Sequence, residues 1–136
     1  MVEVRAFQPS DLTDIPRERL ADPAHPFLIG GYLEELRRHG PAYTLRIDGQ
    51  VYLAGGIAEE PGTGARWLWS FVTMDSGPHM RKIHREVLRF IHTYPGPLLA
   101  ASARSFAAGC RWLTMLGFQP VANPSGLPDH QLFARE

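Results

Sequence analysis

The sequence predicts an α+β domain with a central mixed, mostly antiparallel sheet of six to seven strands, flanked by about four helices. The length of 136 residues and the hydrophobic content of 44% fit one globular domain, residues 1–136, with a sizeable core. Some segments alternate apolar and polar side chains, as strands do, and others repeat apolar residues at helical spacing. The segments occur in the order strand, helix, helix, three strands, helix, strand, helix, strand, strand, which predicts the mixed sheet.

The N-terminal segment has the pattern of a strand followed by a short helix. Residues 2–7 alternate apolar and polar side chains, so we expect a half-buried strand. Ser10 or Asp11 can then cap a helix that extends to about Leu20, because their side-chain oxygens accept hydrogen bonds from helix N–H groups.

A second helix is expected before the central strands. Residues 21–26 contain two prolines and predict a turn-rich linker. The helix that follows ends at Gly40-Pro41. Its apolar residues at helical spacing are Leu28, Ile29, Tyr32, Leu33 and Leu36.

Three strands in the middle of the chain are joined by turns. Residues 43–47 and 51–57 flank Asp48-Gly49, a dipeptide preferred in tight hairpin turns. A glycine-containing turn follows at residues 60–64, and the apolar run at 66–73 is typical of a long, buried strand. Because hairpin turns join these strands, they must be antiparallel.

The C-terminal half alternates strands and helices. Residues 66–101 form a strand–helix–strand unit, which implies a parallel pair with a right-handed crossover and helices on both faces of the sheet. Its helix begins after Pro78 and has the apolar stripe Met80, Ile83, Val87, Phe90 and Ile91. The remaining elements are a strand at 98–101, a helix capped by Ser105 that carries Phe106, Cys110, Leu113 and Leu116 and ends at Gly117, and strands at 118–121 and 131–134.

Composition excludes several classes of protein. The 14 basic and 14 acidic residues cancel, and the lone cysteine, Cys110, excludes an internal disulfide framework and a cysteine-based zinc site. No apolar run approaches the roughly 20 residues of a membrane span, and the N-terminus lacks the apolar block of a signal peptide. We therefore expect a soluble, cytoplasmic protein. Residues 61–136 have eight basic and four acidic side chains, an excess of four that weakly favours an anion such as phosphate.

Two stretches resemble the GNAT (Gcn5-related N-acetyltransferase) superfamily. Val4–Leu12 is similar to that family's first strand and helix cap. Trp112–Phe118 is similar to its late helix, which ends in leucine-glycine-phenylalanine. Together with the order of elements, the resemblance spans nearly the whole chain and implies the GNAT fold and an acetyl-CoA site.

A narrower resemblance is to small GNAT-like proteins of podophages, which are internal virion or virion-assembly proteins. The chain length agrees with theirs. This resemblance implies a phage or prophage origin, virion or host proteins as partners, and a location in the host-cell cytoplasm or the virion. The similar stretches are Trp69–Thr73, Met80–Arg85, Phe106–Phe118 and Gln131–Phe133.

The sequence departs from the GNAT pattern at the cofactor site. The family holds the acetyl-CoA pyrophosphate with successive backbone N–H groups, in a Gln/Arg-x-x-Gly-x-Gly/Ala motif that opens a helix. The corresponding segment, Met74–Lys82, has one glycine, an acidic residue that would repel phosphate, and a proline without an N–H. If acetyl-CoA is bound, the resemblance implies these cofactor-binding residues: Phe71, Val72, Thr73, Gly77, His79, Arg81, Lys82 and Ser105.

The sequence also departs from the family at catalysis. Alignment on the leucine-glycine-phenylalanine motif places Leu113 where the family has a proton-donating tyrosine, and leucine cannot donate a proton. Phe106, next to Ser105, replaces an asparagine common near the start of that helix. Spacing singles out no general base among the candidates, so no catalytic residue is assigned. The candidates are Glu59, Glu60 and Asp75.

The other reactive side chains are interpreted as structural. Cys110 lies on an apolar helix face and is expected to be buried. Trp67 and Trp69 share a strand face, where core packing is the default and a platform for pantetheine or a peptide is the alternative. The basic helix face is expected to be solvated rather than to bind nucleic acid; it comprises Arg81, Lys82, Arg85 and Arg89. No metal site is expected from the scattered histidines, which are His25, His39, His79, His84, His92 and His130.

Two functions remain open on the sequence alone. The first, which we favour at this stage, is a phage- or prophage-encoded GNAT-like protein with a degenerate acetyl-CoA site and no cofactor, acting through protein contacts in virion assembly. The second is an active acetyl-CoA-dependent N-acetyltransferase that acts on an amine of a small molecule or protein. It would hold acetyl-CoA between the strands at residues 71–73 and 99–101.

Overall fold

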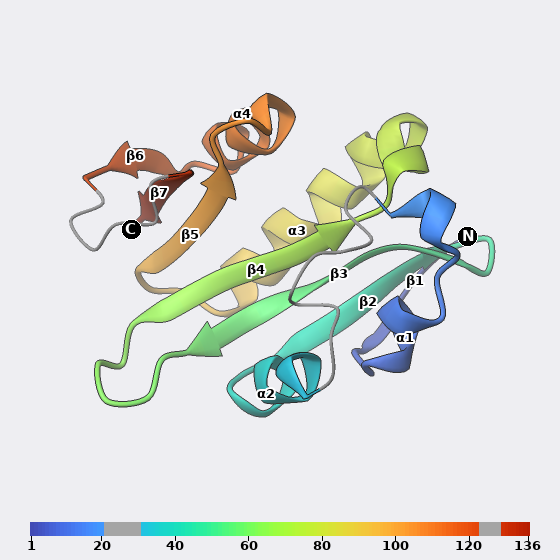
Figure 1. Ribbon diagram of the computed structural model, residues 1–136, viewed down its shortest axis with the longest axis horizontal. Coiled ribbons are helices and arrows are strands. Elements are labelled where there is room, and N and C mark those ends of the chain that lie inside the picture. The colour runs from blue at the N-terminus through green and yellow to red at the C-terminus, as the bar shows by residue number, and fades with distance from the viewer. Residues whose placement is uncertain (21–30, 123–128) are drawn as a thin grey trace.

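A seven-stranded sheet forms the centre of the computed structural model, which describes residues 1–20, 31–122 and 129–136 (Figure 1). The strand order is β1-β2-β3-β4-β5-β7-β6, and neighbouring strands are antiparallel except for β4 and β5. The predicted mixed, mostly antiparallel sheet is therefore confirmed. The strands are β1 (Val2–Ala6), β2 (Ala42–Ile47), β3 (Gln50–Glu59), β4 (Arg66–Val72), β5 (Leu98–Ala103), β6 (Gln119–Val121) and β7 (His130–Arg135).

Helices cover both faces of this sheet, as predicted. Leu53 and Ala54 are neighbours in β3, so their side chains point to opposite faces. Leu53 packs with Ile83 of α3, whereas Ala54 packs with Leu33 of α2. The α-helices are α1 (Ser10–Thr13), α2 (Tyr32–Arg38), α3 (Met80–Thr93) and α4 (Ala107–Met115), and the 3₁₀ helices are η1 (Arg17–Arg19) and η3 (Met74–His79).

Helix α4 lies on the same face of the sheet as α3. The indole N–H of Trp112, in α4, donates a hydrogen bond of 3.0 Å to Nδ1 of His84, in α3. The two helices also share a core with β5, formed by Ile91, Leu98 and Leu116 among others. Side-chain contacts therefore connect the two helices that flank the parallel strand pair.

The first predicted helix is shorter than expected. Helix α1 ends at Thr13, and η1 follows, so no continuous helix reaches Leu20 in this part of the described chain. Neither Ser10 nor Asp11 caps it, because Pro9 occupies the N-cap position. Proline has a fixed φ that suits the start of a helix, so α1 begins at Pro9 without a hydrogen bond from a capping side chain.

Asp11 connects α1 to β2 instead of capping the helix. Its carboxylate accepts hydrogen bonds from the Gln8 backbone N–H (2.9 Å), the Thr44 hydroxyl (2.7 Å) and the Arg46 guanidinium (2.9 Å). Burial alone would raise the pKa of Asp11, but the hydrogen bonds from Thr44, Gln8 and Arg46 hold the pKa below its ordinary value. These hydrogen bonds therefore favour the charged form of Asp11 in the folded protein.

The second predicted helix is partly described. The linker predicted at residues 21–26, and Leu28 and Ile29, lie outside the described residues. Helix α2 begins at Tyr32, and its last helical residue precedes Gly40-Pro41, as expected. A Cβ at Gly40 would lie 1.9 Å from the Ile57 carbonyl oxygen, so glycine is required where the chain turns from α2 into β2.

The predicted hairpin between β2 and β3 is confirmed, whereas two other local predictions are wrong. Asp48 and Gly49 have φ values of 51° and 84°, the pair of positive values of a type I′ turn. Strand β4 was expected to be buried, but its side chains are mostly half-buried, because β5 diverges from it. Ser105 does not cap α4; it lies in a turn, and Phe106 is the N-cap residue.

Candidate functional site

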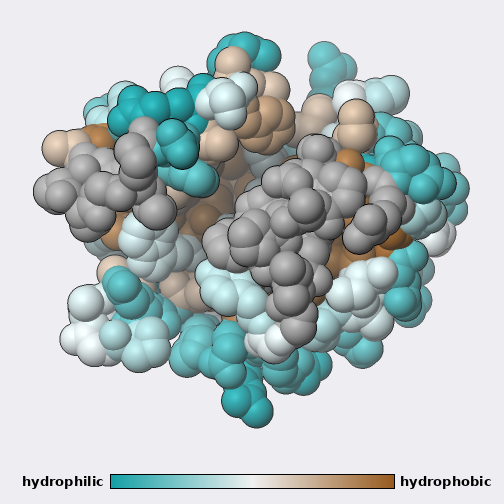
Figure 2. All heavy atoms as spheres, viewed as in Figure 1, coloured by the Kyte–Doolittle hydropathy of each residue, from teal (hydrophilic) through white to brown (hydrophobic). Residues whose placement is uncertain are grey.

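The parallel strands β4 and β5 separate soon after they meet. Within the described residues, Trp67–Leu99 is the register pair that joins them, and the two strands then diverge toward their carboxyl ends (Figure 1). Ser70 and Ala101 are exposed even though both strands are interior strands of the sheet. Figure 2 shows this face of the molecule hollowed, with apolar side chains at the bottom of the recess. The sheet therefore has an opening between β4 and β5.

The segment that follows β4 uses several of its backbone donors internally. The Ser76 N–H donates to the Thr73 carbonyl (3.2 Å), and the Met80 N–H donates to the Gly77 carbonyl. Pro78 has no N–H, and it lies inside the 3₁₀ helix η3. The row of free amide donors typical of a phosphate-binding helix start is therefore interrupted here.

Gly77 leaves the backbone open at the same place. Its φ is not positive, and it is exposed. A Cβ built on Gly77 would meet no heavy atom within 4 Å. Neither backbone conformation nor packing thus requires glycine at this position, and a ligand could approach the main chain closely.

Asp75 is paired with Arg19 at the start of η3. Arg19 Nε and Nη2 lie 2.8 and 3.2 Å from the two carboxylate oxygens, and Nη2 also donates to the Val51 carbonyl (2.9 Å). The hydrogen bond from Arg19, together with its positive charge, lowers the pKa of Asp75. The repulsion of phosphate expected from Asp75 is thus offset by Arg19, and the lowered pKa makes Asp75 a weak general base.

Free positive charges lie in the first turn of α3. Arg81 and Lys82 are exposed, and neither forms a hydrogen bond or an ion pair with a described residue. Lys82 and His79 add to the main effect of the N-terminal ammonium group in lowering the pKa of Asp48, so both lie near the β2–β3 turn. The His79 ring lies 4.5 Å from the Tyr52 ring.

Helix α4 has Leu113 at the position where the family resemblance implies a proton-donating tyrosine, so it contributes no proton donor to the opening there. Leu113 is buried in the core that also contains Leu116 and Phe118. Cys110 is half-buried rather than buried, and its thiol donates a hydrogen bond of 3.7 Å to the Ala103 carbonyl. Ser105 is exposed at the carboxyl end of β5, at the same edge of the sheet as Gly77.

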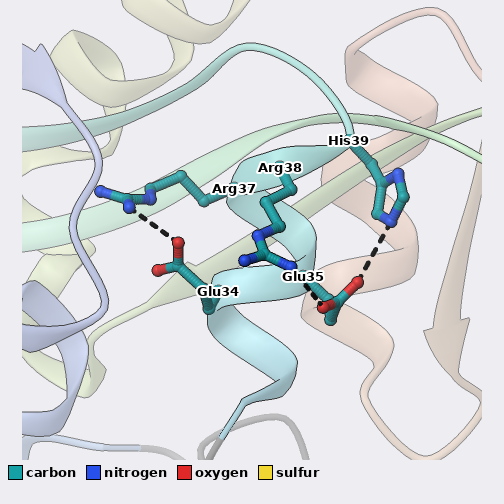
Figure 3. A network of polar contacts seen from close by, with 5 residues as sticks. All are labelled: Glu34, Glu35, Arg37, Arg38 and His39. Carbon is teal, nitrogen blue, oxygen red and sulfur yellow. Dashed lines mark hydrogen bonds and ion pairs between the residues drawn. The ribbon is translucent and has the colours of Figure 1, made fainter.

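Glu59 and Glu60 lie far from this edge. Glu59 pairs with Arg66 in the β3–β4 ladder, and six residues of strand, about 20 Å, separate Arg66 from Val72. Glu59 and Glu60 line an open depression of about 400 Å³, together with residues at the C-terminal end of α2. Figure 3 shows the polar contacts of that end: the ion pairs Glu34–Arg37 and Glu35–Arg38, and the contact between the His39 ring and Glu35. The structure thus does not bring these two candidate bases to the opening.

The remaining candidates have structural surroundings. Trp69 packs edge-on against Phe7, with ring centroids 5.3 Å apart, in the core on the α1–α2 face. His84 accepts the Trp112 hydrogen bond, and Arg89 pairs with Glu86. Among the residues described, no cluster of three or more His, Cys, Asp or Glu side chains could hold a metal ion. His25 lies outside the described residues.

Sequence reasoning missed two residues that shape the site, Ser70 and Arg19. Ser70 marks the opening opposite Ala101, which lies in the predicted range 99–101, yet a small residue in an apolar run resembles any strand position. Arg19 lies 56 positions before its partner Asp75. A pair so distant in sequence has no local pattern, so only the fold reveals it.

Comparisons with solved structures place the whole chain in one fold. No model of a known family matches the sequence, and no curated protein matches it. An assigned phosphinothricin N-acetyltransferase matches with a TM-score of 0.72 and 14% identity, over 100% of this chain and 98% of that chain. This chain has the GNAT fold.

Other GNAT-fold structures match over a similar extent. The Salmonella typhimurium protein yncA, assigned as an acetyltransferase and solved with its cofactor acetyl-CoA, has a TM-score of 0.70 and 14% identity, over 99% of this chain and 93% of that one. The Escherichia coli ribosomal-protein-S18-alanine N-acetyltransferase has a TM-score of 0.67 and 13% identity, over 99% and 93%. Within the described residues, no helix of this GNAT-fold chain is long and apolar enough to cross a membrane.

Proposed function

We propose that the chain is an acetyl-CoA-dependent N-acetyltransferase. The observation that carries this proposal is the divergence of β4 and β5 after Trp67–Leu99, at the edge where α3 begins with unpaired cations. A fold alone does not establish a function, so the proposal rests on the residues at this edge of the sheet. A solved structure of the same fold, yncA, holds acetyl-CoA. The proposal reverses the preference drawn from the sequence alone.

The residues at this edge fit a diphosphate through side chains more than through amides. Arg81 and Lys82 are free to pair with phosphate oxygens, with His79 beside them. Gly77 lets phosphate approach the main chain, although Ser76 and Met80 already donate their N–H groups elsewhere. The opening itself would accept the pantetheine arm of acetyl-CoA along Phe71–Thr73, with Ser105 on the opposite side. We therefore expect weaker binding than a complete glycine motif would provide.

The chemistry that the cofactor supplies is an activated acetyl thioester. The protein's own contribution would be positional: the diverging strands β4 and β5 would hold a neutral amine in line with the thioester carbon, which accelerates direct attack. The described chain places no acid at Leu113, so the proton lost by the amine and the proton gained by the coenzyme A sulfur would both exchange with solvent. We expect a low turnover number for this reason.

Binding of acetyl-CoA, measured by calorimetry on the full chain, tests the proposal. We expect micromolar affinity that falls about tenfold with Arg81→Glu or Lys82→Glu, since each loses a charge-assisted contact. Arg85→Glu is the matched control, because Arg85 is also exposed and unpaired on α3. An equal loss with Arg85→Glu would indicate a general charge effect and contradict the proposed site.

A second candidate function is a non-catalytic role as an accessory protein in virion assembly. The buried Leu113 and the amide donors already used at Ser76 and Met80 support the non-catalytic part of this alternative, and the virion role rests on the sequence resemblance alone. In this case acetyl-CoA would not bind even at millimolar concentration. Capsid or portal genes beside the coding gene would support this alternative.

A further inference from the structure

A second open depression lies away from the opening, between α4 and the strands β6 and β7. Its volume is about 400 Å³, within the range of small-molecule sites. Apolar groups of Pro120 and Phe133 line it, and these two residues face each other in the β6–β7 ladder. Pro120 is exposed and Phe133 is only 3% exposed, so Pro120 supplies most of the accessible apolar wall of the depression.

Two arginines line the same depression without a side-chain partner among the residues that the structure describes. Arg104 follows β5, and Arg111 lies on α4; both are exposed. Neither guanidinium group forms a hydrogen bond or an ion pair with a described residue. The Arg104 backbone N–H donates to the Asp129 carbonyl (2.8 Å), which fixes the main chain of Arg104 while its side chain stays free. Two unpaired guanidinium groups beside one hollow create a local positive potential.

The polar lining is otherwise held in place. Gln131 Nε2 donates to the carbonyls of Val121 (3.0 Å) and Leu132 (2.9 Å), so the amide orientation is set by the main chain. The Cys110 thiol also lines the depression, and its partner is the Ala103 carbonyl. The arginines are thus the groups available for a charged ligand.

We propose that this depression binds a small organic anion, with its carboxylate or phosphate between Arg104 and Arg111 and its apolar body against Pro120 and Phe133. Arginine suits either anion, because its planar guanidinium donates two parallel hydrogen bonds. The site shares no residue with the one proposed for acetyl-CoA, although Arg104 is next to Ser105; its other lining residues lie on α4, β6 and β7 rather than on β4 and α3.

Binding of benzoate, phenyl phosphate and benzyl alcohol to the full chain tests the proposal. Calorimetry gives the affinity, and the rate at which the lone cysteine, Cys110, reacts with a thiol reagent gives a second readout at the site. We expect at least one of the two anions to bind and to slow the thiol reaction, and the neutral alcohol not to bind. The anion with the higher affinity, benzoate or phenyl phosphate, shows whether the site prefers a carboxylate or a phosphate.

Charge reversal then locates the binding. Arg104→Glu and Arg111→Glu should each weaken the anion about tenfold, whereas Arg85→Glu should change it little. Both arginines are exposed, so folding should be retained; Arg111→Gln provides a milder variant. Equal binding of the alcohol, no binding at millimolar concentration, or an equal effect of Arg85→Glu would overturn the proposal. Gly77→Ala should leave this binding unchanged, which separates it from the acetyl-CoA site.

Discussion

Replacement of Asp11 by alanine tests the connection between α1 and β2. The Thr44 hydroxyl is fully buried and would lose its acceptor, at a cost of about 1–3 kcal/mol for an unpaired buried group. The Arg46 guanidinium would lose a charged partner, but it is 28% exposed and can turn to water. We therefore expect Asp11→Ala to lower the free energy of unfolding by about 3 kcal/mol, a large share of a typical total.

A second substitution makes this prediction sharper. Thr44→Val alone should cost about 1 kcal/mol, because the carboxylate keeps its other donors. In the Asp11→Ala background the same change removes the buried unpaired hydroxyl, so it should be neutral or stabilising. The double-mutant cycle should thus give a coupling of about 1–2 kcal/mol. Thr13→Val is the control, since the Thr13 hydroxyl is an exposed donor on α1.

Urea unfolding followed by tryptophan fluorescence and circular dichroism measures these free energies. The pKa of Asp11 is lowered in the folded protein, so its contribution is present above about pH 4, the unfolded value, and is lost as pH falls through the folded pKa. The stability gap between the wild type and Asp11→Ala should therefore close in acid. Additive effects in the cycle, or a gap that does not change with pH, would refute this account of Asp11.

Further predictions concern glycines and one ion pair. Gly77→Ala should leave the melting temperature unchanged while weakening acetyl-CoA, because its Cβ meets open space. Gly109→Ala should destabilise by about 1–2 kcal/mol in urea titrations despite the better helix propensity of alanine, since its Cβ would lie 2.8 Å from Ser102 Oγ. Asp75→Asn should cost about 1 kcal/mol at pH 7, and this cost should disappear in acid, because the pKa of Asp75 is lowered in the fold. A cost that does not shrink as the pH falls through the folded pKa would contradict the role of its charge.

The elements of the fold could be predicted because their signals are local. Asp48-Gly49 requires positive φ values that few other dipeptides tolerate, and the structure has them. The apolar stripe that contains Ile83 and Ile91 predicted α3, and both residues are buried. Helix starts were harder to predict, because several residues compete for one N-cap. Pro9 and Phe106 occupy the positions expected for Ser10 or Asp11 and for Ser105.

The candidate site could be predicted only in part, because it depends on how strands diverge. Residues 71 and 72 end β4, and Thr73 and Gly77 follow it, so a resemblance along the chain located that edge. The exposure of Ser70 and Ala101 depends on where the β4–β5 ladder stops, which no local pattern encodes. The pairing of Arg19 with Asp75 likewise depends on packing between distant segments.

The hydrogen bond from Trp112 to His84 has a consequence for what the opening can accept. It joins the helix that follows β4 to the helix that follows β5, so we expect a change in this contact to alter the separation of those two strands. Selectivity for short or long acyl groups would then be adjustable at positions that never touch the ligand. Trp112→Phe would remove this hydrogen bond while keeping an aromatic side chain at the same position.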